Sequence, residues 1–140
     1  MTSAEKSIAC LASVRPELAQ IARHLANDCR AMGINIIYTW GLRTNVEQAI
    51  LYAQGRSTPG RIVTQAPDAS RTPHGRGAAL DFAILDPTRP GTLTWAQGLF
   101  YKVGQHATQL GLEWGGNWPK HPDPPHIQIQ GWQQLSYPWP

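Results

Sequence analysis

The chain has 140 residues, with 12 Lys and Arg against 9 Asp and Glu, so its formal net charge is +3. This length fits one domain, and charged residues make up only 15%, which excludes a charge-rich disordered chain. No apolar run reaches membrane-spanning length, and two cysteines are too few for a disulfide scaffold or an all-thiolate zinc site. The first eleven residues contain charged side chains and only a short apolar patch, so we expect no secretory signal.

Two helices are predicted at the start of the chain. Thr2 and Glu5 have the spacing of a capping box, which indicates a short helix through Val14. A second helix is expected to begin at Pro16, because proline suits the first helical position, and to end at Gly33. Its predicted apolar stripe consists of Leu18, Ile21, Ala22, Leu25, Cys29 and Met32. Since Cys29 lies on this stripe, we expect it to pack in the core and to take no part in chemistry.

A strand, a helix and a loop are predicted next. Residues 34–40 are β-branched and aromatic, which is typical of a strand. Thr44 and Glu47 form a second capping box and open a helix that we expect to end at the next glycine. Residues 56–71 are predicted to form a long loop with one short strand, Ile62 to Thr64.

The second half of the chain mixes strands with one further helix. Residues 78–85 read as a central strand, and the alternation of residues 126–130 indicates another. Thr94 and Gln97 are expected to open a helix between them, which ends at Gly111 and is followed by a short strand. The inward residues of this helix are predicted to be Trp95, Leu99, Val103 and Leu110.

Taken together, these elements predict one domain over residues 1–140. Helices that precede a mixture of strands and helices favour an α+β fold, with a small, mainly antiparallel sheet and helices packed on it. The proline-rich last 22 residues are expected to wrap the surface as ordered loop.

Positive charge gathers in the first half of the chain. Residues 1–76 have nine cations and five anions, a net charge of +4, whereas residues 77–140 have a net charge of −1. The arginines are scattered singly and do not alternate with aromatic residues, so we expect no nucleic-acid partner. The remaining alternatives are ordinary solvated surface and contact with an anionic substrate.

Two segments contain unusual sets of metal-capable side chains. The first runs from Thr72 to Asp81 and includes His74, and the second runs from Asp123 to His126. Zinc in a hydrolase needs three protein ligands and an open position for water. His74, Asp81 and His126 would supply two imidazoles and a carboxylate, which leaves Asp123 to accept the proton of the water.

The predicted strands favour this arrangement. Alternation places Leu80 and Phe82 on the face opposite Asp81, while the residues that share its face are small alanines that leave room for a metal. His126 begins another strand, so two paired strands could present Asp81 and His126 side by side. The alternatives are that Asp81 pairs with an arginine and that His126 is an ordinary buried histidine.

The pattern Thr-x-His-x-x-Gly-x-Ala-x-Asp, with the later Asp-x-x-His, resembles the motifs of the zinc D-alanyl-D-alanine carboxypeptidase and L-alanyl-D-glutamate peptidase family. The chain is most similar to the short phage endolysins of the L-alanyl-D-glutamate endopeptidase branch, in order from about residue 15 to residue 130. The other matching segments are Arg15-Pro16-Glu17-Leu18, Gly41-Leu42-Arg43-Thr44, Glu47-Gln48, Leu51-Tyr52-Ala53-Gln54-Gly55-Arg56 and Glu113-Trp114-Gly115-Gly116-Asn117-Trp118.

The resemblance implies a hedgehog/DD-peptidase-like fold and one zinc ion, with His74, Asp81 and His126 as its ligands. It implies that Asp123 is the catalytic base and that Arg43 lies near the scissile carbonyl or the substrate carboxylates. Further substrate contacts are expected, less specifically, at Thr72, Gln48, Trp114 and His121. Glu113 could reach the same site or remain in solvent. Trp114 and Trp118 could line a substrate groove or pack in the core, and both alternatives remain open.

The activity implied is that of a zinc-dependent peptidoglycan peptidase that hydrolyses the L-Ala–D-Glu bond of stem peptides. Such an enzyme would be a phage or prophage endolysin, made in the host cytoplasm without a signal peptide and active on the wall, from the periplasm, after release. Its partner would be the stem peptide, and we expect a monomer with no stable membrane association. The alternatives are a D-Ala-D-Ala carboxypeptidase and a non-catalytic cell-wall-binding module of the same fold.

Overall fold

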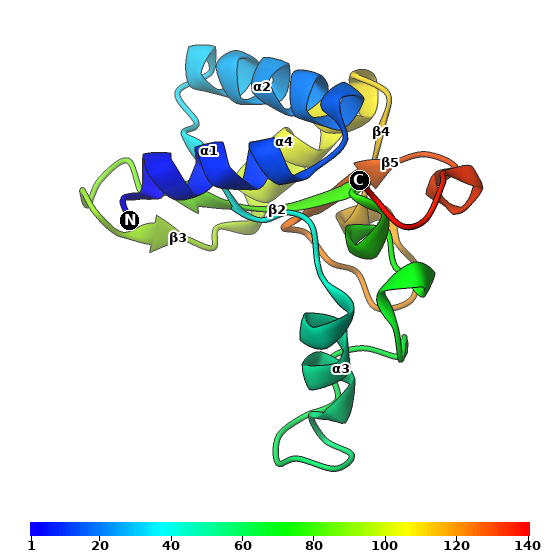
Figure 1. Cartoon of the computed structure of the whole chain (residues 1–140). Helices are drawn as coiled ribbons and strands as arrows, with labels where there is room; N and C mark the ends of the chain where they lie inside the picture. Colours follow the sequence, from blue (N-terminus) through cyan, green and yellow to red (C-terminus); the bar gives the residue numbers. More distant parts are fainter.

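Three helices cover one face of a central sheet, and one short helix with long loops covers the other (Figure 1). This computed structural model describes residues 1–140. The helices are α1 (Ser3–Ser13), α2 (Pro16–Ala31), α3 (Asn45–Ala53) and α4 (Gln97–Gln109). The strands are β1 (Ile36–Trp40), β2 (Ala79–Leu85), β3 (Leu93–Thr94), β4 (Leu112–Trp114) and β5 (His126–Ile129). Short 3-10 helices span Ala69–Arg71, His74–Arg76, Gly115–Asn117 and Trp132–Gln134.

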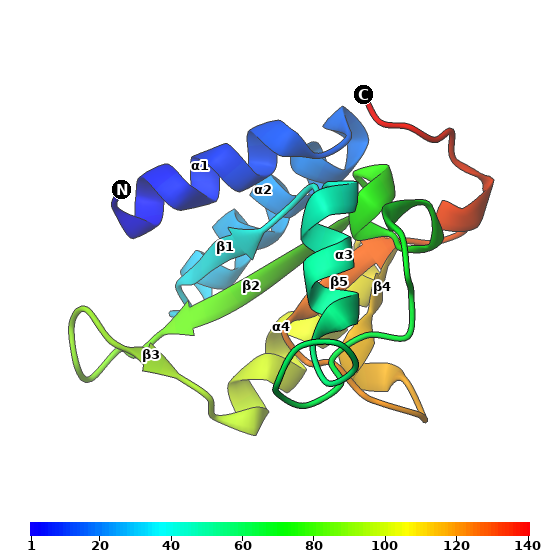
Figure 2. The same cartoon turned by 60° about the horizontal axis from the view of Figure 1, so that its bottom comes forward.

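The sheet is antiparallel throughout, which confirms the α+β architecture. Its strand order is β1-β2-β5-β4, and the two-residue β3 pairs with the end of β2. The central strands β2 and β5 therefore run side by side, although some 45 residues separate Asp81 from its register partner His126. Figure 2 shows this sheet from the side on which α3 lies.

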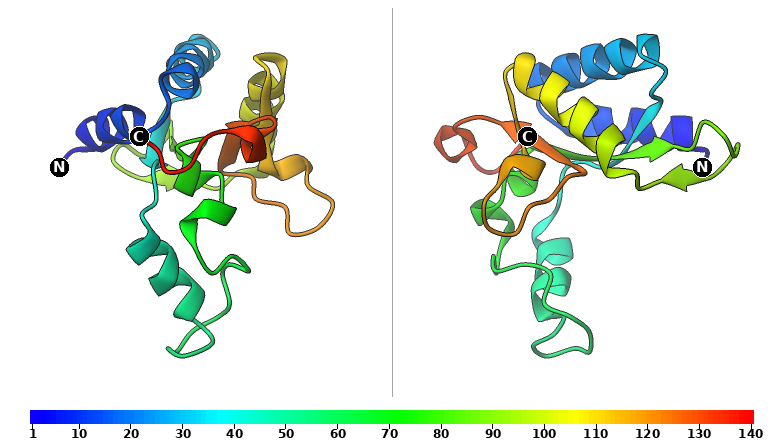
Figure 3. Two further views of the ribbon diagram at one scale, coloured as in Figure 1. Left: turned by 45° about the vertical axis from the view of Figure 1, so that its right-hand side comes forward. Right: turned by 180° about the vertical axis from the view of Figure 1, so that it is seen from behind.

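The core lies between the sheet and the helices α1, α2 and α4, which stay together on one side in every view (Figure 3). Leu80, Phe82 and Ile84 of β2 are buried in the same core cluster as Leu18 and Leu25 of α2. Burial of these apolar side chains is the main stabilising contribution to such a domain. None of the helices is both long and apolar enough to cross a membrane.

Both capping boxes predicted from the sequence are present. Thr2 caps α1 and accepts a hydrogen bond from the backbone N–H of Glu5 at 3.1 Å. Thr44 caps α3 in the same way through Glu47. Pro16 occupies the first turn of α2, as expected. The cap of α3 matters for the site, because it fixes the helix directly after the chain has passed Arg43.

Several local predictions are wrong. Residues 62–64 form no strand, because they run beside α3, away from any sheet edge, where Gln48 donates a hydrogen bond to the hydroxyl of Thr64. Thr94 belongs to β3, and α4 begins at Gln97 without a side-chain cap. Trp95, expected to point inward, is 64% exposed, since it precedes the helix.

Met32 was expected on the apolar stripe of α2 but is half exposed, because it lies beyond the last helical turn as the C-cap. Cys29, one turn earlier, is fully buried, as expected, and makes no disulfide.

Candidate active site

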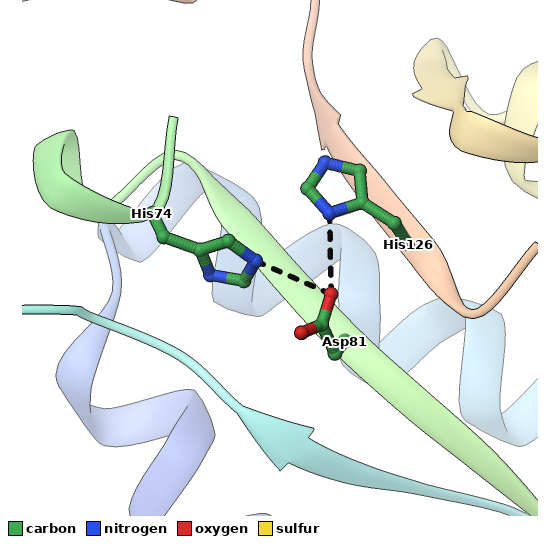
Figure 4. A group of neighbouring side chains, drawn as sticks. All are labelled: His74, Asp81 and His126. Carbon is green, nitrogen blue, oxygen red and sulfur yellow. Dashed lines mark hydrogen bonds and ion pairs between the residues drawn. The ribbon is translucent and has the colours of Figure 1, made fainter. Parts of the chain in front are cut away.

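Two strands and one turn bring the three predicted metal ligands together. Asp81 of β2 and His126 of β5 are register partners, and His74 comes from the turn that leads into β2. Both imidazoles point at the same carboxylate oxygen, Oδ1 of Asp81, at 3.2 Å from Nε2 of His74 and 3.1 Å from Nδ1 of His126 (Figure 4). One atom from each of the three residues lies within 4.8 Å of the others, so the group could hold a metal ion.

The turn that carries His74 has little conformational freedom. The hydroxyl of Thr72 accepts a hydrogen bond from the N–H of Gly75 at 2.8 Å and donates one to the carbonyl of Ala69. Gly75 packs so closely on the backbone of Ala69 that no Cβ would fit there. Gly77 ends the turn with a φ of +65°, in the left-handed region that glycine enters without strain.

The C-terminal residues 133–140, called the strap below, contact the same turn from outside. Two arginines hold them there. The side chain of Arg15 donates to the carbonyls of Arg76 and Ser136, at 2.7 and 2.6 Å. Arg76 in turn donates to the carbonyls of Gln133 and Leu135. The ring of Trp139 covers Arg15 and lies against Gly77. The C-terminal segment therefore wraps the surface as an ordered loop and ends beside the turn that carries His74 (Figure 2).

Each imidazole is oriented by a hydrogen bond on its outer nitrogen. Nδ1–H of His74 donates to the carbonyl of Gly41 at 2.8 Å, so Nε2 faces Asp81. Nε2–H of His126 donates to the side-chain oxygen of Gln128 at 2.7 Å, so Nδ1 faces Asp81. In their neutral forms both rings therefore direct a lone pair at the same point, as zinc-binding histidines do.

The electrostatics of the group favour a charged carboxylate. Burial disfavours the charge of Asp81. When the rings of His126 and His74 carry both protons, however, the hydrogen bonds that they donate to Asp81 outweigh burial and hold the Asp81 pKa well below its usual value. Burial alone would lower the pKa of His126, whereas the hydrogen bond and the charge of Asp81 raise it, with a net shift upward. Two nitrogens and one anionic oxygen form a donor set that suits zinc and leaves a coordination position open.

The group opens into a cavity of about 510 Å³. Asp123 and Arg43 both line it, as does Trp118, whose ring centroid is 5.1 Å from that of His126. The other lining residues are Leu51, Val63, Thr64, Thr72, Pro73, Gln128 and Trp132. The cavity therefore combines a candidate metal group, a carboxylate and a guanidinium under partly aromatic walls.

Asp123 lies beside the candidate metal group without belonging to it. Its Oδ2 is 3.9 Å from Nδ1 of His126, and its side chain is 47% exposed. Backbone hydrogen bonds from its own N–H to Gly115 and from the N–H of His126 to its carbonyl fix the segment. Burial raises the pKa of Asp123 above the usual value, which moves this carboxylate toward the range of a useful general base.

Arg43 reaches the same cavity from the segment between β1 and α3. Its backbone N–H donates to the carbonyl of His74, and its guanidinium donates to the side-chain oxygen of Gln48 at 3.2 Å. The buried Nε of Arg43 has no hydrogen-bond partner in the chain, and burial lowers the pKa of its guanidinium. A buried donor without a partner costs free energy, so this nitrogen suits an oxygen that a ligand supplies.

The remaining expected contacts divide into two groups. Thr72 lines the cavity, and Gln48 is fully buried behind Arg43, which it orients. Trp114 lies in the hydrophobic core, where its indole N–H donates to the carbonyl of Pro124, and His121 lies on an exposed loop. The structure does not bring Trp114 and His121 to the cavity, so their positions do not support the substrate contacts expected for them.

Gln128 is a polar residue of the site that was not predicted from the sequence. Gln128 lies behind His126 and lines the cavity. The alternation of β5 places Gln128 on the same face as His126, two residues earlier, so strand periodicity was the signal that could have found it.

Known proteins share both the sequence and the fold of this chain. A family model described as D-alanyl-D-alanine carboxypeptidase matches residues 66–129. The peptidoglycan L-alanyl-D-glutamate endopeptidase CwlK of Bacillus subtilis (strain 168) is 33% identical over 125 residues, which cover 83% of this chain and 73% of CwlK. The L-alanyl-D-glutamate peptidase of Listeria phage A118 is 28% identical over 124 residues, 89% of this chain but only 41% of that longer protein.

The L-Ala D-Glu endopeptidase ChiX of Serratia marcescens has a similar solved structure. The TM-score is 0.69 over 90% of this chain and 87% of ChiX, at 23% identity, so this similarity concerns the fold. The 33% identity to CwlK, extended over most of both proteins, is the stronger evidence of common descent. The chain therefore belongs to the D-alanyl-D-alanine carboxypeptidase and L-alanyl-D-glutamate peptidase family of zinc metallopeptidases.

Proposed function

We propose that this chain is a zinc-dependent endopeptidase that cuts the L-Ala–D-Glu bond of peptidoglycan stem peptides. The observation that carries the proposal is the convergence of His74, Asp81 and His126 on one point at the floor of an open cavity, with Asp123 beside them. The relatives named for L-alanyl-D-glutamate cleavage, one of them from a phage, support this bond and a role in host lysis.

The proposed reaction assigns one task to each side chain. A zinc ion held by His74, Asp81 and His126 would supply Lewis acidity, which makes a nucleophilic water available near neutral pH and polarises the scissile carbonyl. Asp123 takes a proton from the attacking water and returns it to the leaving amine, so that the peptide bond breaks with no net loss of protons. Its upward-shifted pKa suits both transfers.

Arg43 is proposed to bind an oxygen of the substrate. Its unpartnered Nε would donate to the scissile carbonyl as negative charge develops there, or to a substrate carboxylate next to the bond. Gln48 holds the guanidinium in place and ties it, through hydrogen bonds to Thr64 and Ala66, to the loop that forms another wall of the cavity.

Digestion of purified Gram-negative peptidoglycan, with products identified by mass spectrometry, tests this proposal. We expect peptides with a new N-terminus at D-Glu, and we expect a chelator to abolish their release. Loss of a terminal D-Ala would instead identify a D-Ala-D-Ala carboxypeptidase, the activity for which the matching family model is described. Zinc binding with no product at all would indicate a non-catalytic cell-wall-binding module.

A further inference from the structure

A chain of hydrogen bonds leads from the candidate metal group to the outer strand of the sheet. Nε2 of His126 contacts the side-chain oxygen of Gln128 at 2.7 Å, and the side-chain nitrogen of Gln128 contacts Oε2 of Glu113 at 2.8 Å. Glu113 and Gln128 are register partners across β4 and β5. Gln128 is only 4% exposed, so little water competes for these contacts.

The direction of every hydrogen bond in this chain is set by Glu113. An ionised carboxylate can only accept hydrogen bonds, and the indole N–H of Trp118 donates to the same Oε2 at 2.9 Å. The amide of Gln128 must therefore turn its NH2 group toward Glu113 and its oxygen toward His126. An oxygen at that position accepts the proton of Nε2 of His126. A neutral ring protonated there has its lone pair on Nδ1, the nitrogen that faces Asp81.

We propose that Glu113 and Gln128 are positioning residues that hold His126 in the tautomer and orientation needed to bind the metal. The inference rests on the proposed metal site, in which Nδ1 of His126 is a ligand atom. Outer hydrogen bonds of this kind fix ring orientation and increase the basicity of metal-binding histidines. Glu113 acts through Gln128 and has no contact with the metal position.

Glu113 also controls the wall of the cavity. Trp118, which it holds by the indole N–H, lies 5.1 Å from the ring of His126, with an angle of 51° between the two planes. One carboxylate thus restrains His126 from behind, through Gln128, and from the side, through Trp118. Loss of the carboxylate should loosen the imidazole in both directions.

Substitution of Gln128 by leucine tests the tautomer directly. Gln128→Leu keeps a side chain of similar size but removes the acceptor for Nε2–H of His126. In the metal-free protein, at a pH where His126 is neutral, Gln128 and Asp81 compete for the single ring proton. Nitrogen NMR should therefore show a larger fraction of the Nε2–H tautomer in the native chain than in the variant, where Asp81 remains as the acceptor. The dissociation constant for zinc, measured by competition with a chromogenic chelator, should rise about 10- to 100-fold.

Gln130→Leu is the matched control, because Gln130 follows β5 directly but is exposed and outside the hydrogen-bond chain. This variant should keep the native tautomer and zinc affinity. Glu113→Gln is a second variant that preserves shape, and it should weaken zinc binding because its amide no longer fixes the orientation of Gln128. The proposal is overturned if both Gln128→Leu and Glu113→Gln retain the native tautomer and affinity.

The double variant Glu113→Gln with Gln128→Glu tests the order of donors and acceptors. It exchanges the two groups, so that a carboxylate accepts from Nε2–H of His126 and an amide lies behind it. Zinc affinity should return to within a few-fold of the native value, whereas affinity as low as in Glu113→Gln alone would contradict the proposal. Failure of the native protein to bind zinc would refute the metal site itself, and the NMR result would still report on the tautomer.

Discussion

The two faces of the sheet are stabilised by different interactions, although the same strands form both. Along β2, Leu80 and Phe82 are buried in the core under the helices, whereas Asp81 between them faces the cavity. Along β5, Ile127 belongs to the core and His126 to the cavity. The helix-covered face is apolar and close-packed, and the cavity face is held by hydrogen bonds between distant parts of the chain.

This comparison separates the interactions that stabilise the fold from those that orient the side chains of the site. Apolar burial contributes most of the free energy of folding but has no directional preference, so it places strands without aiming side chains. Hydrogen bonds contribute less each, but they fix angles, as the carbonyl of Gly41 does for His74 and Gln128 does for His126. Substitutions on the two faces should therefore have separable effects on unfolding and on metal binding.

The largest expected effect is a loss of turnover, caused by substitutions on the cavity face. Asp123→Ala should lower the rate of stem-peptide hydrolysis by about 10²- to 10⁴-fold, the usual contribution of a general base, while zinc remains bound. His74→Ala should lose both zinc and activity, because it removes one of the three ligands. Elemental analysis of the purified variants and product release measure the two quantities. Retained turnover in Asp123→Ala would remove the proposed role of this carboxylate.

The next largest effect is a loss of stability, caused by a substitution on the helix-covered face. Leu80→Ala should lower the free energy of unfolding by about 2–5 kcal/mol, because it leaves a cavity in the core. Denaturant titration of the metal-free protein measures this loss. Zinc affinity of the folded variant should be unchanged, whereas Asp81→Ala, one residue along β2, should abolish tight zinc binding. Equal loss of zinc in the two variants would show that the faces are not separable.

A smaller loss of stability is expected where the C-terminal strap contacts Arg15. Arg15→Lys keeps the charge but cannot reproduce both hydrogen bonds of the guanidinium, so the free energy of unfolding should fall by about 1–3 kcal/mol. Limited proteolysis should cleave the last ten residues faster than in the native chain. Arg23→Lys, at an exposed position of α2, is the control and should change neither. Unchanged proteolysis in Arg15→Lys would show that the strap is held by other contacts.

The smallest effect concerns a buried thiol. Burial raises the pKa of Cys29 to about 11, so near pH 8 only about one molecule in a thousand carries the thiolate. Iodoacetamide should therefore leave Cys29 unmodified in the folded protein and alkylate it once denaturant is added, as peptide mapping would show. Rapid alkylation under native conditions would mean that the core beneath α2 opens readily.

Strand periodicity explains why much of the site could be predicted from the sequence. Alternation alone places Asp81 on the face opposite its apolar neighbours, and the structure pairs it with His126 as expected. The same rule applies to Gln128, but its partner Glu113 is contributed by another strand, and only the register of β4 and β5 reveals the contact.

The errors arose where tertiary contacts override local signals. Residues 62–64 have a strand-like composition, yet α3 offers them hydrogen-bonding side chains and no sheet edge. Thr94 has the spacing of a helix cap, but it pairs with the end of β2 and therefore belongs to β3. Trp114 carries no local sign of whether it faces the core or the cavity, because a three-residue strand is too short for a clear alternation.

The strap has a consequence for protein engineering. The chain leaves the fold at its C-terminus beside Trp139, which lies against the turn that carries His74, so a domain or tag fused there would pull on a proposed metal ligand. Met1 is 89% exposed at the start of α1, away from the C-terminus (Figure 2). Fusion proteins built on this scaffold should therefore carry their added domains in front of Met1.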